Sequence, residues 1–243
     1  MKKQDFVFIL ILLAAVGLFI PVPFLKGLQQ GFIYNHDYWL ITSFLKFALL
    51  STIGESLGLR MRKGVYNEPG FGLLPRAIVW GFLGIGIKMA FVIFASGTPV
   101  LLAGFFGIDN AAKSMSDYPD IFAASAAGLG TTRVVTAFFI SVFMNLIFAP
   151  VFMTLHKITD THIVNNGGTL KGFFTPIPFG KIFPSLNWYV QWDFVFKRTI
   201  PFFWIPAHTV TFLMAPQYRI VFAAMLGVVL GVLLTIAAQK SRE

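Results

Sequence analysis

Six stretches of mostly apolar residues follow one another along the chain, separated by polar or basic segments. They cover Phe6–Leu25, Tyr38–Leu59, Gly72–Ala95, Val134–Leu155, Thr199–Ala215 and Ile220–Ala238. Each is close to the roughly 17–25 residues that an α-helix needs to cross hydrocarbon. Continuous apolar runs of this length are typical of helices and not of barrel strands. The pattern predicts an all-α fold, a polytopic transmembrane helix bundle in which residues 1–243 form one integral membrane domain.

Two longer connections join these stretches. The first, Ser96 to Arg133, begins with the apolar run Val100–Ile108, which predicts a re-entrant or interfacial segment. The second runs from His156 to Arg198. Near its end Trp188, Trp192 and Phe196 recur every four residues, so an aromatic stripe is expected at the level of the lipid headgroups.

The positions of lysine and arginine predict the orientation. With the N-terminus in the cytoplasm, thirteen of the lysines and arginines in loops or near span ends lie on the inner side and four on the outer side. The outer four are Lys26, Lys113, Arg133 and Arg219. Because cytoplasmic loops carry an excess of positive charge, the bias predicts six spans with both termini inside.

The composition fits a lipid environment. Charged residues make up 12% of the chain and hydrophobic residues 56%, whereas soluble domains carry about 25% charge. The net charge of +9 is spread through the gaps between apolar runs, so we expect the lipid bilayer and no nucleic acid as partner. The absence of cysteine excludes disulfides and thiol chemistry. The expected location is the plasma membrane, or an organellar membrane if the source is eukaryotic.

Small residues spaced three or four apart predict faces where helices touch, because close approach holds helices together in lipid. Such positions occur in the third and sixth stretches. They are Gly81, Gly84, Ala223, Gly227 and Gly231. The helices are expected to pack against one another along these rows, and the same rows could also assemble a homo-oligomer.

Ionisable and polar side chains inside the apolar stretches are the candidates for function, because an unpaired charge there costs at least about 2.5–3.5 kcal/mol. The candidates for a polar lining are Lys46, Glu55, Lys88, Asn145 and His208. Lys46 and Glu55 are nine residues apart and lie on opposite faces of one helix, so they cannot pair with each other. Two interpretations stay open: an interhelical ion pair of Glu55 with Lys88, or a water-filled passage lined by cations. Arg76 and Arg219 lie at span ends and are expected to reach the interface.

No catalytic, nucleotide-binding or metal-binding motif is present. His156, Asp160 and His162 do not share one helix face, so we expect no metal site and no cofactor.

The C-terminal part resembles the Mpv17/PMP22 family of integral membrane proteins. The residues that carry the resemblance are Trp204, Pro206, Phe212, Pro216 and Arg219. They correspond to the family's Trp-Pro pair, the Phe of its Asn-Phe pair, the Pro of its Val-Pro pair and its Arg. The likeness covers residues 143–238 and, more weakly, 50–95. It departs where Ile205 separates Trp from Pro, and where Thr211 replaces Asn. The resemblance implies a small membrane protein of channel-like, weakly selective character.

Three functions follow as hypotheses. The first is a solute-passage protein with a cationic lining, in which His208 makes passage pH-dependent. The second is a membrane-embedded enzyme acting on lipid or isoprenoid substrates through Glu55, Asp160 or the histidines. The third is a structural or partner-binding membrane subunit. Because no catalytic motif is present, we expect that the protein is not an enzyme.

Overall fold

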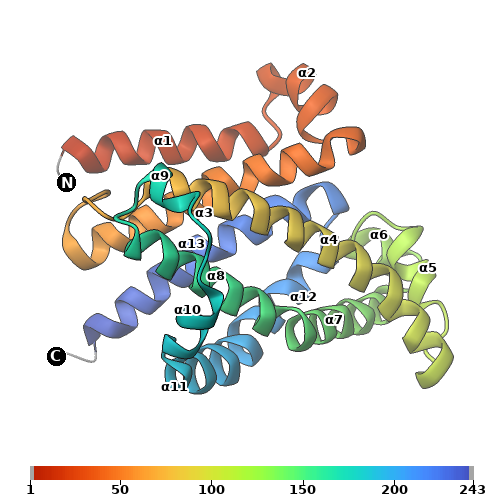
Figure 1. Ribbon diagram of the computed structural model, residues 1–243. Helices are drawn as coiled ribbons and strands as arrows, with labels where there is room; N and C mark the ends of the chain where they lie inside the picture. The colour runs from red at the N-terminus through yellow and green to blue at the C-terminus, as the bar shows by residue number, and fades with distance from the viewer. Residues whose placement is uncertain (1–2, 241–243) are drawn as a thin grey trace. The chain divides into compact units, whose positions relative to one another are not determined.

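The computed structural model describes residues 3–240, with side chains described as far as Val229. The prediction of an all-helical chain is confirmed, since no β-strand occurs among these residues. The longer helices are α1 (Lys3–Phe19), α3 (Trp39–Lys63), α4 (Leu73–Phe106), α7 (Gly130–Ile147), α8 (Ala149–Asn165), η4 (Gln191–Trp204), α12 (Ile205–Leu213) and α13 (Pro216–Lys240). Short helical turns connect them: η1 (Pro23–Leu25), α2 (Lys26–Leu28), η2 (Gln29–Ile33), η3 (His36–Tyr38), α5 (Ala111–Ser116), α6 (Ile121–Ala126), α9 (Leu170–Phe173), α10 (Phe179–Ser185) and α11 (Trp188–Val190) (Figure 1).

Within the described part of the chain, three helical segments are long and apolar enough to cross a membrane: His36–Lys63, Leu73–Phe106 and Gly130–Ile147. The helices Lys3–Phe19 and Pro23–Ile33 are bent by 58° to each other. If they form one span, the described residues contain a fourth candidate span. Pro216–Val229 is a shorter apolar helix. The chain is thus a helical protein with three to four candidate membrane spans.

Several element boundaries differ from the sequence prediction. Val100–Ile108 is no re-entrant segment, because α4 runs on through Pro99 to Phe106. It ends at Gly107, whose φ of 64° is a left-handed conformation that glycine adopts readily. The stretch Val134–Leu155 is two helices, α7 and α8. They are separated at Phe148, since Pro150 has no amide hydrogen to continue the α-helical ladder.

The chain divides into two compact units, and α4, α8 and α13 contribute residues to both. The first unit comprises Met1–Ile85, Asp160–Ile177 and Ile220–Glu243, and the second comprises Gly86–Thr159 and Pro178–Arg219. Each unit therefore combines segments far apart in the sequence. The division follows spatial contacts and does not test the expectation of one integral membrane domain.

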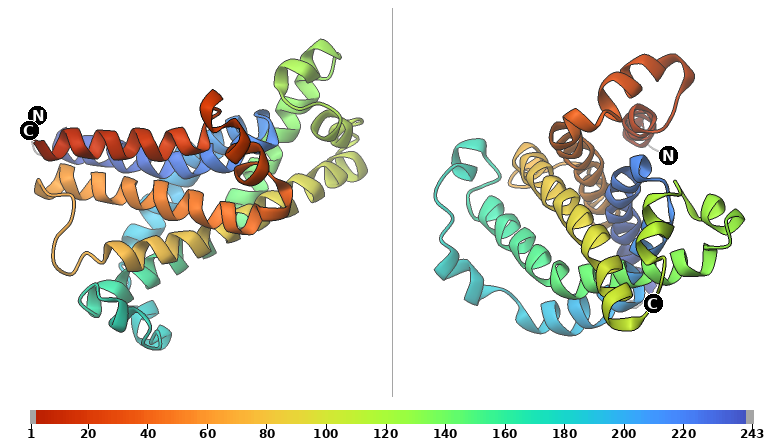
Figure 2. Two further views of the ribbon diagram at one scale, coloured as in Figure 1. Left: turned by 90° about the horizontal axis from the view of Figure 1, so that it is seen from above. Right: turned by 90° about the vertical axis from the view of Figure 1, so that its right-hand side faces the viewer.

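In the first unit, α3 packs against α1 and α13 (Figure 2). Gly54 allows the closest approach: a Cβ atom there would lie 3.1 Å from the backbone Cα of Val228. Glycines also bring α4 onto α3, since Gly81 lies against the ring of Phe44 and Gly84 against Phe47. Such contacts need a missing side chain, as in other close-packed helix pairs.

The residues predicted to pack along α13 differ in their surroundings. Ala223 is buried, with 6% of its surface exposed. A Cβ atom at Gly227, however, would meet no described atom within 4 Å. The neighbouring Val228 makes the helix contact instead. Gly231 lies beyond Val229, the last residue whose surroundings the structure describes.

In the second unit, α7 is the central helix. It packs against α12, η4 and the short helices α5 and α6. The predicted break before the last helix is present: α12 ends at Leu213, Met214 is extended, and α13 begins at Pro216. Proline suits the first position of a helix, where its missing N–H would have no partner.

Candidate functional site

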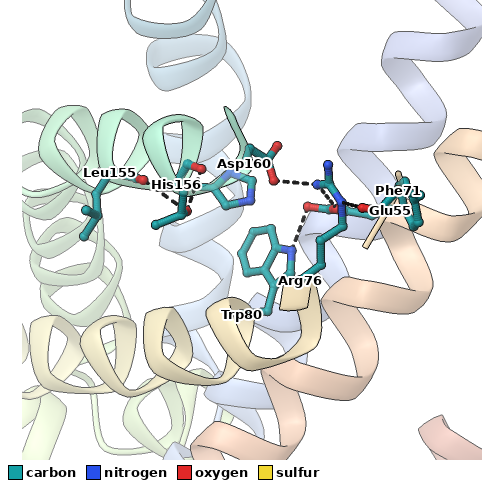
Figure 3. Close-up of polar contacts among 8 residues, drawn as sticks. Glu55, Phe71, Arg76, Trp80, Leu155, His156 and Asp160 are labelled. Carbon is teal, nitrogen blue, oxygen red and sulfur yellow. Dashed lines mark hydrogen bonds and ion pairs between the residues drawn. The ribbon is translucent and has the colours of Figure 1, made fainter. Parts of the chain in front are cut away.

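The most concentrated group of charges in the first unit surrounds Arg76. Its Nη1 atom donates to Oε2 of Glu55 at 2.5 Å and to Oδ1 of Asp160, while its Nε atom donates to the carbonyl of Phe71 at 2.7 Å. Figure 3 shows the guanidinium between the two carboxylates, which come from α3 and α8. We call Glu55, Arg76 and Asp160 the charge cluster.

Arg76 is the most buried member of the charge cluster, and its two partners are half-buried. The side chain of Arg76 is 9% exposed, and those of Glu55 and Asp160 are 18% and 20% exposed. The indole Nε1 of Trp80 donates to Oε1 of Glu55 at 2.7 Å, and the ring of Phe71 lies 4.6 Å from the Arg76 guanidinium carbon. Low exposure strengthens the attraction between opposite charges and raises the cost of leaving one unpaired.

Two glycine-containing loops place the cluster. Gly72 and Gly168 both adopt positive φ, 73° and 67°. A Cβ atom on Gly168 would lie 2.7 Å from the backbone of Gly70, so the two loops can meet only where side chains are absent. This contact holds the end of α8 beside the start of α4, where Asp160 reaches Arg76.

Arg76 was expected to extend to the membrane interface, and this expectation is wrong. The guanidinium points into the first unit and binds the two carboxylates. Sequence reasoning missed the cluster because Glu55, Arg76 and Asp160 are separated by 21 and 84 residues. No helical spacing connects them. The one available signal was that Arg76 and Glu55 flank the same connection, between the second and third apolar stretches.

Lys46 is a second buried charge of the first unit, at 5% exposure. Its Nζ atom donates to the carbonyl of Ile33 at 3.2 Å and lies 5.8 Å from the centre of the Tyr34 ring. The π-helical turn η2 ends at Ile33, so the ammonium group satisfies a carbonyl at that end. Lys46 therefore holds the segment that follows α1 against α3.

The second unit brings together Asn145 and His208, two of the candidate lining residues. Nδ1 of His208 lies 3.1 Å from Nδ2 and 3.2 Å from Oδ1 of Asn145. Nδ2 of Asn145 also donates to the carbonyl of Ser141 at 2.8 Å. The imidazole ring stacks on Trp204, with 5.3 Å between ring centres, and meets Phe91 edge-on. Polar contacts on one side and aromatic rings on the other fix its orientation.

Three of the family-signature residues, Phe212, Pro216 and Arg219, lie around the end of α12 and the start of α13. Nε and Nη2 of Arg219 donate to the carbonyls of Met214 and Phe212, at 3.0 and 3.2 Å. Its guanidinium carbon lies 5.6 Å from the centre of the Phe212 ring. Arg219 thus satisfies carbonyls that the helix end leaves open, a local role in place of the expected extension to the interface. Trp204 stacks on His208 one turn further back.

Arg133, which was counted only as an outer-loop charge, is fully buried. Its guanidinium donates to the carbonyls of Ser114, Tyr118 and Pro119 at 2.7, 2.8 and 3.2 Å. These contacts organise the loop between α5 and α6 around the start of α7. A buried arginine that binds three carbonyls is a structural organiser of this loop, which a count of basic residues cannot reveal.

An open hollow of about 590 Å³ lies in the same unit. It is lined by Ile121, Ser125, Gly128, Gly130, Thr131 and Val134. None of the candidate lining residues borders it. Lys88 is half-buried and belongs to this unit, whereas Glu55 makes its ion pair with Arg76 in the first unit.

The fold and these buried polar groups define the chain as a helical protein with candidate membrane spans. Comparisons with family models, with curated proteins and with solved structures gave no match. Membership of the Mpv17/PMP22 family therefore stays a prediction.

Proposed function

We propose that the chain is a multi-pass plasma-membrane protein that provides a weakly selective passage for small anionic solutes. The observation that carries the proposal is the charge cluster, in which Arg76 joins carboxylates from two other helices within a mostly apolar chain. Ionisable residues inside membrane helices are rare because they are costly, and they mark solute and ion pathways.

The proposed roles differ between the candidate residues. In the second unit, Lys88 gives the passage its positive character and Asn145 orients His208. The charge cluster holds α3, α4 and α8 together and represents the closed state. Separation of Asp160 from Arg76 would release α8 from α4 and open the passage, while Arg76 stays paired with Glu55. The Mpv17/PMP22 resemblance supports the channel-like character and carries no further weight.

Reconstitution into planar bilayers tests the proposal. We expect anion-selective currents, a lower anion preference in Lys88→Ala, and a higher open probability in Asp160→Asn. The matched control is Lys113→Ala, which removes an exposed lysine of α5 and should leave the currents unchanged. Absence of conductance at every voltage and pH would contradict the proposal.

The proposed topology has six spans with both termini in the cytoplasm. Because the chain contains no cysteine, a single introduced cysteine reports its own location without background. With Lys113→Cys we expect labelling of intact cells by an impermeant maleimide. With Lys181→Cys we expect labelling after permeabilisation only. The reverse pattern would invert the topology, and labelling of both positions in intact cells would rule out this placement of the two loops.

The convergence of Glu55 and Asp160 also favours a second candidate, a membrane-embedded enzyme acting on lipids. Two carboxylates at one place are the arrangement that general acid–base chemistry uses. Under this function, Asp160→Asn would change the lipids that copurify with the protein. Unchanged copurifying lipids together with altered conductance would favour the passage.

A further inference from the structure

The segment from Pro178 to Trp204 in the second unit carries an exposed face of large aromatic side chains. Four of them are 48–78% exposed: Phe179, Phe183, Tyr189 and Trp192. The opposite side of the segment is buried, with Ile182, Leu186 and Ile200 at 2–8% exposure. The segment is therefore amphipathic, and its outer face is too apolar to be stable against water alone.

Aromatic contacts make part of this face rigid. The rings of Phe183 and Trp188 meet edge-on at 4.7 Å, and the Trp188 indole Nε1 donates to the carbonyl of Phe183 at 3.0 Å. Trp192 and Phe196 also meet edge-on, at 6.4 Å. Trp and Tyr are enriched at the boundary of hydrocarbon and water, because they combine an apolar body with a polar N–H or O–H.

Basic side chains accompany the aromatic face. Lys181 is exposed, and the side chains of Lys197 and Arg198 are 67% and 62% exposed. Asp193 lies 3.7 Å from the Lys197 ammonium and 3.0 Å from the Arg198 guanidinium. One carboxylate thus keeps two cations together, and the segment retains a positive excess with donors free to face outward.

We propose that residues 178–198 form a binding surface for anionic phospholipid headgroups. The aromatic side chains enter the boundary of the acyl region, while Lys181, Lys197 and Arg198 bind the phosphate groups. Aromatic insertion selects a membrane surface, and the charge excess selects its anionic lipids. Lipid binding at this surface requires only that the protein lies in a membrane. It does not depend on the proposed passage for solutes.

The first experiment counts lipids bound to the purified full chain by native mass spectrometry. Phosphatidylglycerol and phosphatidylcholine are added at equal concentrations. We expect the wild type to retain phosphatidylglycerol preferentially, and the variant Lys181→Gln/Lys197→Gln/Arg198→Gln to lose roughly tenfold or more of that preference. The charge-matched control is Lys26→Gln/Arg62→Gln/Lys113→Gln, which removes three exposed cations elsewhere and should keep the preference. An equal loss in both variants, or no preference in the wild type, would overturn the proposal.

A second measurement does not depend on the folding of the triple variant. Brominated phosphatidylglycerol and brominated phosphatidylcholine are compared as quenchers of tryptophan fluorescence, and Trp192→Phe isolates the contribution of Trp192. We expect stronger quenching of Trp192 by the anionic lipid, and no competition from inorganic phosphate at the same concentration. Competition by phosphate would identify a simple anion site. Quenching by neither lipid, together with an oligomeric protein, would indicate that a second copy covers the face. Either outcome overturns the proposal.

Discussion

The guanidinium of Arg76, one turn into α4, lies 2.5 Å from the carboxylate of Glu55, which comes from the second half of α3. Because the same guanidinium nitrogen also donates to Asp160, one cation balances two acids from different helices. Removal of the guanidinium would take away the positive charge that these two nearby carboxylates share.

We expect Arg76→Gln to destabilise the protein by about 3 kcal/mol, the lower end of the range for breaking a buried ion pair. Thermal unfolding in detergent measures the change. Arg62→Gln is the control, since Arg62 is an exposed cation on α3. Glu55→Gln introduced together with Arg76→Gln should recover part of the loss. Additive effects of the two substitutions would show that the residues are not energetically coupled.

Gly54→Ala should weaken the packing of α3 on α13, because the new methyl group would lie 2.9–3.3 Å from atoms of Val228, including its backbone. The expected loss is about 1–3 kcal/mol, as for other overpacked sites. Gly58→Ala, one turn along the same helix, meets only the end of the Arg62 side chain at 3.7 Å. It should be neutral or stabilising, because alanine favours helix. Equal unfolding temperatures for the two variants would argue against a tight contact at Gly54.

Asn145→Ala should destabilise the second unit by about 1–3 kcal/mol, because the imidazole of His208 would lose its side-chain hydrogen-bond partner. Gln217→Ala removes an exposed amide and serves as the control. Chemical denaturation in mixed micelles measures both. If Asn145→Ala unfolds like the control, the amide does not orient the imidazole.

Tyr66 lies outside the membrane-spanning segments and donates to Asp5 at 3.0 Å. Burial and then this hydrogen bond raise the pKa of Tyr66 above its ordinary value of 10.0. A raised pKa in the folded state means that its contribution is complete below about pH 10 and is lost as the pH rises through the folded pKa. We therefore expect the wild type to lose more stability than Tyr66→Phe between pH 9 and the alkaline limit of the measurement. Parallel stability profiles would show that the phenol does not titrate differently on folding.

Local patterns in the sequence were sufficient to predict helices and their approximate positions. Apolar runs of about twenty residues require helices whenever lipid is the solvent, and Pro216 marks the last break without any tertiary information. The errors arose where local signals were weak. Pro99 does not stop α4, whereas Pro150 separates α7 from α8. The continuing apolar run up to Phe106 does not distinguish an interfacial segment from a longer helix.

The partners of the polar side chains were decided by the tertiary structure alone. The sequence identified Glu55, Lys46, Asn145 and His208 as unusual because charge and polarity are costly in apolar helices. It could not assign Arg76 and Asp160 to Glu55, since ion pairing depends on atoms approaching within a few ångströms across large separations in the chain. Helix formation follows from neighbouring residues. The charge cluster depends on the loop contact at Gly70 and Gly168, which brings α8 to α4, and such a contact has no signature in the local pattern.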